Sequence, residues 1–565
     1  MKKIQSTKMI HAVRTMGLVL ACGAMLTGCK DYLTEIEPGK TMLGDYYTSP
    51  EAAIQNVTGC YVPLMWEYGD TYFPEWFIGD VVSDDALKGG GSTTDMADAY
   101  DMENWRTTNQ NALLLSFYRA QYQGIGRCNL ALKYIPELDF PENDTWTPEL
   151  KNRLLGEIYY LRGYYYFRLV RVFAGVPLVT KVLDNDSEWG QPRASVSEVY
   201  NQILSDFEKA AELLPVKSST FYTESDLGRA TKGAAQAMLL KTNLYMASPY
   251  WQTYSLEKSA AQYYAAAKSW GDSIITSGEY DLCPVYGDNF TVAGENGLES
   301  VFEIQYAAVT WGDYGNGSHM GFTAGSFTQQ LVRSRSAQIG AGWGFNHPTQ
   351  NLYDEFETGD LRRDEAILTP KESLMENISE EKYLENAYLN NKTGMYRDTL
   401  PDGSKGVGGW GNVLDHATRG PLNSRQIRYA DVLLMYAEAC LGTGDEATAK
   451  TYINKVRDRV GLGEVGTYSI KINGVEITSP TVEQCLRHER RMELAMEGHR
   501  WFDLVRWQGV DGKGLKQHMD AYAATESKGA KAHIQAFVAG KHEIFPIPQK
   551  EIQLNPTEMK QNPGY

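Results

Sequence analysis

The feature that most constrains the fold is a run of apolar residues at helical spacing. Between residues 154 and 169 these residues are three or four positions apart: Leu154, Ile158, Leu161, Tyr165 and Leu169. Such spacing places them on one face of a long amphipathic helix. A glycine and a proline at residues 175–177 end the helix and begin an extended run.

The same spacing recurs in several segments joined by short turns. Ser195 and Glu198 have the arrangement of a capping box, and Pro215 stops the helix that they open. Further helices are predicted at 231–246, 259–275, 427–462 (with a turn at 442–444) and from Thr481 to about residue 496. Antiparallel helix pairs of this kind indicate a tetratricopeptide-like stack and a mostly α fold.

Two other regions depart from the helical pattern. Residues 471–477 alternate around Asn473-Gly474, which predicts a β-hairpin. Residues 282–426 are dense in glycine and carry scattered aromatic residues. Long ordered loops are usually functional, so an irregular ligand-binding face is expected there.

The N-terminus carries an export signal. Four cationic residues precede an apolar stretch, from Met16 to Leu26, that is too short to span a bilayer. The residues that follow, Leu26-Thr27-Gly28-Cys29, resemble the bacterial lipobox, in which the cysteine is acylated and becomes the new N-terminus. The resemblance implies a signal peptide at 1–28 and lipidation of Cys29, with membrane attachment by the lipid alone.

The rest of the chain divides by pattern. Residues 29–50 form a polar tether, and residues 51–565 are expected to be one domain. Within that domain we distinguish a helical N-terminal half at 51–281, the loop-rich region at 282–426 and C-terminal helical motifs at 427–565.

The composition excludes some partners. The formal net charge is −17, and it becomes −21 once residues 1–28, with their four positive charges, are removed. Such a chain repels phosphate backbones, so no nucleic acid is expected as a partner. Acidic polysaccharides are disfavoured as well, unless a local basic patch opposes the overall charge. With 36 Tyr, 12 Trp and 17 Phe, the chain is suited to recognise sugars or peptides.

The sequence shows neither a cysteine framework nor a catalytic motif. The five cysteines that remain after processing and lipidation are widely scattered and predict neither a disulfide framework nor a metal site. His488-Glu489 is not followed by the second histidine of a zinc-protease motif, and no nucleophile elbow or phosphate loop is found. Gly89-Gly90-Gly91 is interpreted as a flexible loop. The sequence therefore predicts that the chain is not an enzyme.

A series of motifs in chain order is more specific. They are LRGYYYFRLV (161–170), GVPLV (175–179), RYADVLLMYAEA (428–439), INKVRDR (453–459), ERRMEL (489–494), EGHRWFDLVRW (497–507), IFPIPQKEI (544–552) and QNPGY (561–565). Together, behind a lipobox, they resemble the SusD/RagB family of nutrient-binding outer-membrane lipoproteins. Residues 489–507 themselves are interpreted as structural, a packed helix end held by partly buried ion pairs.

The resemblance implies a function. The chain would be a cell-surface lipoprotein of the outer membrane that captures oligosaccharides, with a SusC-like TonB-dependent transporter as its partner and no cofactor. Two alternatives stay open from the residues alone. The same scaffold could bind peptides, or the protein could be a surface glycoside hydrolase that uses paired carboxylates.

The best candidates for ligand binding lie in predicted loops that combine aromatic rings with polar groups. A tryptophan in a loop rich in Gly and Asp has little local apolar surface to bury against, which favours stacking on a sugar. The candidates are Trp76, Asp80, Asp84, Trp105, Arg106, Asn109, Trp311, Tyr314 and Trp343. Asp85, Asp313 and Asn346 accompany them.

A calcium site was considered at Asp95, Asp98, Asp101 and Glu103, because hard cations bind carboxylate oxygens. The order of these residues is not that of an EF-hand. No metal is predicted, and solvated loops are expected for these aspartates and for Asp84-Asp85.

Overall fold

The structure is a computed structural model that describes residues 46–66, 74–141, 146–308, 324–374, 388–396, 400, 403, 416–526 and 536–565. The chain divides into two units, Met1–Ala52 and Ala53–Tyr565. Of the first unit only residues 46–52 are described, and helix α3 (Pro50–Tyr61) begins there. The packed helices and strands lie in the second unit. The predicted boundaries at residues 28, 50, 281 and 426 stay a prediction.

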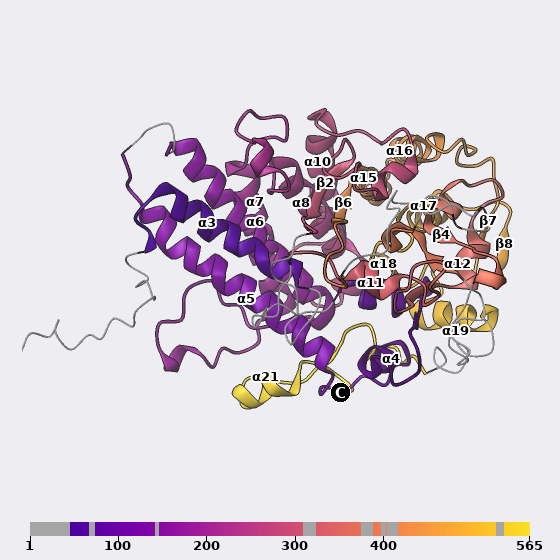
Figure 1. Cartoon of the computed structure of the whole chain (residues 1–565), viewed down its shortest axis with the longest axis horizontal. Helices are drawn as coiled ribbons and strands as arrows, with labels where there is room; N and C mark the ends of the chain where they lie inside the picture. Colours follow the sequence, from indigo (N-terminus) through magenta and orange to yellow (C-terminus); the bar gives the residue numbers. More distant parts are fainter. Residues whose placement is uncertain are drawn as a thin grey trace, which may run out of the picture. The chain divides into compact units, whose positions relative to one another are not determined.

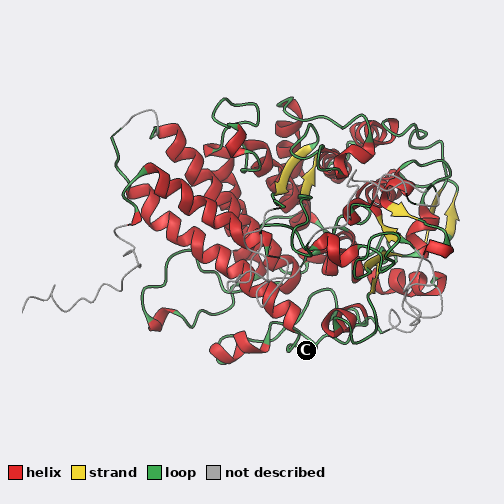
Figure 2. Ribbon diagram, in the orientation of Figure 1, coloured by secondary structure: helices red, strands yellow, loops and turns green. Residues whose placement is uncertain are grey.

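Long helices dominate this unit (Figures 1 and 2). The helices of its first half are α4 (Ala97–Glu103), α5 (Ala112–Tyr134), α6 (Pro148–Phe173), α7 (Val196–Leu213), α8 (Lys232–Ala247), α9 (Pro249–Gln252) and α10 (Ala260–Thr276). Those of its second half are α11 (Thr328–Val332), α12 (Gln350–Glu355), α13 (Arg362–Ala366), α14 (Asn391–Gly394), α15 (Tyr429–Gly442), α16 (Glu446–Asp458), α17 (Val482–Leu494), α18 (Arg500–Trp507), α19 (Leu515–Thr525) and α21 (Gln549–Leu554).

The helices stack in chain order. Helix α5 packs on α6, α6 on α7, α7 on α8 and α8 on α10; α10 then packs on α15, which contacts both α16 and α17. Each helix thus buries its apolar face against the next, as in a tetratricopeptide-like stack. The prediction of a mostly α fold built from helical hairpins is confirmed.

Local sequence sets where the helices begin. The predicted capping box of α7 is present, with the Ser195 hydroxyl and the Glu198 carboxylate each accepting the other residue's backbone N–H. Thr481 and Gln484 cap α17 in the same way. Satisfying these otherwise unpaired donors stabilises the first turn of each helix.

Helix α6 is buried on nearly every face, which the predicted single apolar face does not anticipate. Its arginines explain the difference. Arg162 forms an ion pair with Asp206 of α7 at 2.6 Å, and Arg168 forms one with Glu75 at 3.1 Å. Because each guanidinium finds a carboxylate, the charged face of the helix can be buried as well.

The loop-rich region is an insertion into the helical stack. Helices α10 and α15 pack together although 152 residues separate Thr276 from Tyr429. Strand β2 (Ser300–Ile304) pairs antiparallel with β6 (Ser424–Arg428), with Ile304 opposite Ser424. The segment between these strands therefore leaves and re-enters the stack at one place, beside α8 and α15.

The remaining strands form short antiparallel pairs. They are β1 (Ala86–Gly89) with β3 (Phe345–Pro348), β4 (Ile367–Leu368) with β5 (Leu389–Asn390), and β7 (Ile470–Ile472) with β8 (Val475–Ile477). The last pair confirms the predicted hairpin, since Asn473 and Gly474 both have positive φ, as its two-residue turn requires.

One loop prediction is wrong. Gly89 ends strand β1, and the N–H of Gly90 donates to the carbonyl of Gly344 at 2.6 Å. Both glycines are buried, since pairing with β3 holds a segment that was predicted to be flexible.

Two further properties of the described residues bear on the predictions. Four of the five remaining cysteines are buried, Cys283 is half-buried, and all five are free thiols. Within the described part of the chain, no helix combines the length and apolar character needed to cross a membrane.

Candidate functional site

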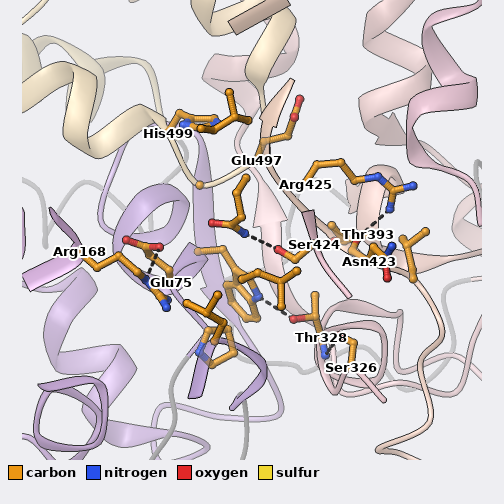
Figure 3. Close-up of a pocket in the computed structure, with 18 of the residues that line it drawn as sticks. Glu75, Arg168, Ser326, Thr328, Thr393, Asn423, Ser424, Arg425, Glu497 and His499 are labelled. Carbon is orange, nitrogen blue, oxygen red and sulfur yellow. Dashed lines mark hydrogen bonds and ion pairs between the residues drawn. The ribbon is translucent and has the colours of Figure 1, made fainter. Parts of the chain in front are cut away.

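A cavity of about 110 Å³ lies where the insertion meets the helical stack (Figure 3). One wall comes from α6 and α8, and another from strands β2 and β6. The start of α11, helix α14 and the turn at residues 496–499 close the remainder. The cavity thus gathers segments from all three regions distinguished in the sequence.

The turn between α17 and α18 is shaped for its place in the wall. Met496 and Gly498 both have positive φ. A Cβ added at Gly79 would lie 2.1 Å from the carbonyl oxygen of Gly498, so Gly79 allows this close approach. The turn presents Glu497 and His499 to the cavity.

Aromatic rings supply the apolar part of the lining. Trp76 is half-buried; its ring packs on Phe77 at 4.0 Å, and its Nε1–H donates to the hydroxyl of Thr328 at 3.2 Å. Trp66, Tyr164 and Tyr306 also border the space. Rings beside polar groups suit a sugar, which offers both C–H faces and hydroxyls.

Buried polar groups that lack a hydrogen-bond partner form another part of the lining. Among the described residues that line the cavity, Thr393 Oγ1, Gln329 Oε1 and Trp66 Nε1 are buried without a hydrogen-bond partner. A buried unpaired polar atom costs about 1–3 kcal/mol. A ligand with hydroxyl groups would satisfy them.

Charged groups hold the walls together. Arg168 and Arg171 both pair with Glu75, and together they lower its pKa although burial alone would raise it. Lys392 pairs with Glu497 at 2.7 Å, yet burial lowers the pKa of Lys392 to about 8. Burial and the charge of Lys241 lower the pKa of His499 to about 4, so this imidazole is neutral at pH 7.

Described residues on either side of two undescribed stretches line this cavity. Trp66 and Pro74, which flank residues 67–73, both line it. Tyr306 and Ser326 line it on either side of residues 309–323, and the N–H of Ala307 donates to the carbonyl of Ala324 at 2.8 Å. The candidates Trp311, Asp313 and Tyr314 fall in the second stretch and lie outside the described residues.

The structure brings some of the candidates together. Trp76 and Trp343 both pack against the buried cluster formed by Phe327, Leu331, Val332 and Phe345. Trp343, also half-buried, meets Phe327 edge-on at 5.1 Å. Of the described candidates only Trp76 lines the cavity itself. For Trp76 and Trp343, a role in ligand binding stays a prediction.

Asp80 does not line the cavity, but it contacts the turn at residues 496–499 that does. One of its carboxylate oxygens accepts the N–H of Gly498 at 2.8 Å, and the other accepts from Asn346 at 3.3 Å. Burial, with the nearby charge of Asp85, raises the pKa of Asp80 to about 8. This carboxyl is therefore mostly protonated at neutral pH, and it fixes the turn that carries Glu497.

For Asp84 and Asp85 the expectation of a solvated loop is wrong. Both are buried. Arg500 bonds Asp84 through two nitrogens at 2.7 and 2.8 Å, and His518 Nε2 lies 2.8 Å from the same carboxylate. Arg491 pairs with Asp85 at 2.8 Å. The C-terminal motifs supply both arginines, so the contacts support a structural role for both aspartates.

Trp105 is likewise buried, with 7% of its surface exposed. Its ring packs between Trp501 and Phe537, at 5.1 and 5.0 Å, and stacks on His542. The premise that a tryptophan in this loop lacks apolar neighbours is wrong for Trp105, because segments distant in sequence provide them. The contacts of Trp105 support a role in packing.

Its two neighbours lie nearer the surface. Arg106 is exposed and pairs with Asp101 at 3.0 Å, and the carbonyl of half-buried Asn109 accepts the N–H of Gln549 at 2.7 Å. Neither lines the cavity, so the structure separates Trp105, Arg106 and Asn109 from Trp76.

The acidic residues considered for calcium have separate partners. Asp95 and Glu103 accept the backbone N–H groups of Gly91 and Lys88, Asp98 accepts that of Ala112, and Asp101 pairs with Arg106. Across the part of the chain that the structure describes, no group of three or more His, Cys, Asp or Glu side chains could hold a metal ion.

Sequence reasoning missed most of the cavity. Thr393, Asn423 and Arg425 come from the insertion, while Arg168 and Lys241 lie on helices, where ligand contacts were not sought. One signal was available. Arg168 lies in the Tyr-rich motif at 161–170, where a charge on an otherwise apolar helix indicates a buried partner.

The interpretation of residues 489–507 as structural is confirmed and extended. Glu489 pairs with Arg362 and with Arg457, and Glu493 pairs with Arg362, Arg428 and Arg459. These ion pairs are fully buried, where only partial burial was expected. They join the insertion to α16 and α17.

The stacked hairpins and their insertion define a helical binding scaffold. The model of the SusD family matches residues 298–565, and a second model, described as starch-binding associating with outer membrane, matches residues 32–244. The chain therefore belongs to the SusD/RagB family. Proteins of this family are non-catalytic binding proteins, which agrees with the expectation that the chain is not an enzyme.

Individual relatives resemble the chain over most of its length. SusD-like protein P38 of Formosa agariphila is 28% identical over 499 residues, which are 86% of this chain and 90% of that protein. A SusD-like protein of Bacteroides ovatus is 26% identical, over 87% of this chain and 82% of that protein.

Solved structures also resemble the chain over most of its length. A laminarin binding SusD-like protein is 27% identical, with a TM-score of 0.69 over 91% of this chain and 99% of that chain. A SusD homolog from Bacteroides thetaiotaomicron has a TM-score of 0.73 over 93% of this chain and 99% of that chain; at 21% identity it shows the fold alone.

Proposed function

We propose that this protein is a cell-surface lipoprotein that captures oligosaccharides and delivers them to a SusC-like TonB-dependent transporter in the outer membrane. The cavity carries the proposal. It combines the half-buried ring of Trp76 with buried hydroxyl, amide and indole groups that lack a hydrogen-bond partner. Family membership supports the same function.

The cavity is the proposed point of capture. A sugar ring would stack on Trp76, and its hydroxyls would pair with Thr393, Gln329 and Trp66. Tyr306 and Ser326, on either side of residues 309–323, line the cavity, so Trp311 and Tyr314 are retained as proposed contacts. Trp343, which packs against the same buried cluster as Trp76, is also retained as a proposed contact.

Membrane attachment is proposed to occur through the lipid on Cys29. The Leu26-Thr27-Gly28-Cys29 motif after an apolar stretch supports this. The same motif supports export, and the family supports a position at the outer membrane facing the cell exterior.

A glycan array that also carries peptides tests the proposal. The purified full-length protein in detergent is expected to retain a set of oligosaccharides, to leave them unchanged and to ignore the peptides. Laminarin is the first glycan to include, because a relative at 27% identity is named for binding it. Retention of peptides alone, or hydrolysis of a bound glycan, would contradict the proposal.

A further inference from the structure

The charges around the cavity run against the charge of the whole chain. The chain carries a net charge of −17. Among the described residues, five cationic side chains line the cavity, namely Arg168, Arg171, Lys241, Lys392 and Arg425, and only two carboxylates do, Glu75 and Glu497. Since His499 is neutral at pH 7, the described lining has an excess of three positive charges.

The carboxylates that pair with the lining cations other than Arg425 do not cancel this excess, because each is shared between two cations. Glu75 is shared by Arg168 and Arg171. Glu497 lies 2.7 Å from both Lys392 and Arg428.

The third such carboxylate is Asp431. It lies 3.3 Å from Lys241 and 2.8 Å from Arg490. Burial lowers the pKa of Lys241, and the positive charges of Arg171 and Arg490 add to this effect. The charge of Lys241 is thus only partly compensated.

Arg425 is the cation with the weakest compensation. Its nearest carboxylates, Glu303 and Glu295, lie 3.8 and 4.0 Å away, beyond hydrogen-bond distance. Burial also raises the pKa of Glu295 to about 7, so this carboxyl is only partly ionised at neutral pH. The side chain of Arg425 is 6% exposed. Its Nη1 and Nη2 donate to the backbone carbonyls of Asn423 and Thr291, each at 2.7 Å, whereas its Nε has no hydrogen-bond partner among the described residues.

Figure 3 shows Arg425, Asn423 and Thr393 on one side of this space and Glu75 with Arg168 on the other. A buried positive charge with incomplete compensation attracts an anion strongly, because little water screens it. A guanidinium matches the planar oxygen pairs of carboxylate and sulfate groups.

We propose that the cavity selects an acidic oligosaccharide, placing the carboxylate of a uronic acid or a sulfate ester of the sugar against Arg425. The inference rests on the proposed glycan-binding function and names its substrate class. The sugar ring would stack on Trp76 while the anionic group completes the charge balance. The two anionic groups share this chemistry, so the test separates them.

The experiment is calorimetry on the full-length protein in detergent with three probes of similar size. They are an oligogalacturonate, which carries carboxylates, a sulfated galactan oligosaccharide, and laminarihexaose, which is uncharged. We expect at least one anionic probe to bind 10-fold or more tighter than laminarihexaose at low salt. That preference should shrink as salt is added. The probe that binds identifies the anionic group.

Substitutions locate the effect. Arg425→Gln should weaken the anionic probe about 10-fold or more, as expected for loss of a charge-assisted hydrogen bond. Arg425→Lys should retain part of the affinity, because it keeps the charge. Arg119→Gln is the matched control, since the side chain of Arg119 is 42% exposed and does not line the cavity. Should Arg425→Gln fail to fold, the salt dependence of the wild-type protein decides.

The outcomes separate the two proposals. If laminarihexaose binds as tightly as both anionic probes and Arg425→Gln leaves all affinities unchanged, the acidic-glycan inference fails and glycan binding stands. If none of these probes and no oligosaccharide on the array binds, both fail.

Discussion

Asp80 and Asp84 lie four residues apart and are both buried, yet their pKa values shift in opposite directions. Burial raises the pKa of Asp80 to about 8, and the charges of Asp85 and Glu497 contribute. For Asp84, Arg491 and Arg500 overcome the effect of burial and hold the pKa well below its usual range. Burial raises the pKa of both carboxyl groups. Only Asp84 has arginine partners that reverse this effect, so the partners explain why the two charge states differ.

The first prediction concerns pH. Unfolded Asp80 releases its proton near pH 4, whereas the folded protein holds it to about pH 8. Stability should therefore fall as the pH rises from about 4 to about 8, and Asp80→Asn should remove that part of the decline. The variant should be tolerated at pH 7, because Asn346 Oδ1 lacks a partner among the described residues and could accept from the new amide. Urea denaturation across this pH range measures the effect.

Asp84→Asn is the matched comparison. It leaves Arg500 without its carboxylate, so we expect a loss of about 3–5 kcal/mol at pH 7. Because the folded pKa of Asp84 is depressed, this carboxylate stabilises the protein above about pH 4, and its contribution is lost as the pH falls further. Equal stability of the two variants at pH 7 would contradict the assignment.

The second prediction separates two tryptophans that the sequence placed in one region. Trp76→Ala should weaken binding of the cognate glycan by on the order of 1–3 kcal/mol, roughly 5- to 150-fold, with little loss of stability. Trp105→Ala should instead destabilise the fold by about 3–5 kcal/mol, because it empties a buried aromatic cluster. Calorimetry and thermal unfolding on both variants give the two readings. A stable Trp105→Ala protein that had lost glycan binding would reverse the assignment.

At the scale of single elements, helix α5 contains two glycines in different surroundings. A Cβ added at Gly124 would lie 2.3 Å from the ring of Tyr165 on α6, whereas one at Gly126 would meet nothing within 4 Å. Gly124 is therefore required for the close packing of α5 on α6. Gly126 only lowers the helical propensity of α5.

The third prediction follows from this pair. Gly126→Ala should stabilise the protein by about 0.5–1 kcal/mol, since alanine restricts the unfolded chain and fits the helix. Gly124→Ala should destabilise it by about 1–3 kcal/mol, because Tyr165 must move. The midpoint of urea unfolding measures both changes. Similar midpoints for the two variants would show that Tyr165 adjusts without cost.

The helices were predictable because their signals are local. Capping residues and apolar spacing located α7, α8, α10, α15 and α17 to within about two residues. Local patterns could not show that α10 packs on α15, or that residues 300–304 pair with 424–428, since both depend on contacts across the insertion. Trp105 and Asp84 were misjudged for the same reason, because Trp501 and Arg500 approach them from about 400 residues away.

The candidate site also depends on long-range contacts. Trp76 was found from its type and its loop, which are properties of the sequence. Arg425 and Lys241 were not, because only the folded chain brings β6 and α8 to one cavity. The composition, with a net charge of −17, does not reveal the local excess of positive charge there. From the sequence alone, an acidic glycan could be expected only if a local basic patch were present.

For the molecule as a whole, the fourth prediction concerns attachment. Cys29→Ala should leave the protein without lipid and release it from the membrane, because the thiol that would carry the acyl chains is gone. Metabolic labelling with an alkyne fatty acid tests this directly. The matched control is Cys22→Ala, which lies within the predicted signal peptide and should leave labelling unchanged. Equal label on the Cys29→Ala and wild-type proteins would refute the anchor.

The fifth prediction concerns the partner, and it depends on the family rather than on a surface that the structure identifies. A binding protein that catalyses nothing needs a path by which its ligand enters the cell, and a TonB-dependent barrel in the same membrane would provide it. Affinity purification from the native outer membrane in gentle detergent should therefore recover a large β-barrel transporter with the lipoprotein. The association should persist in Trp76→Ala, because that substitution is expected to affect the glycan and not the partner. It should weaken in Cys29→Ala, since loss of the lipid removes the confinement that raises the effective concentration of the two proteins. Elution of the wild-type lipoprotein alone would contradict delivery to a transporter while leaving glycan capture in place.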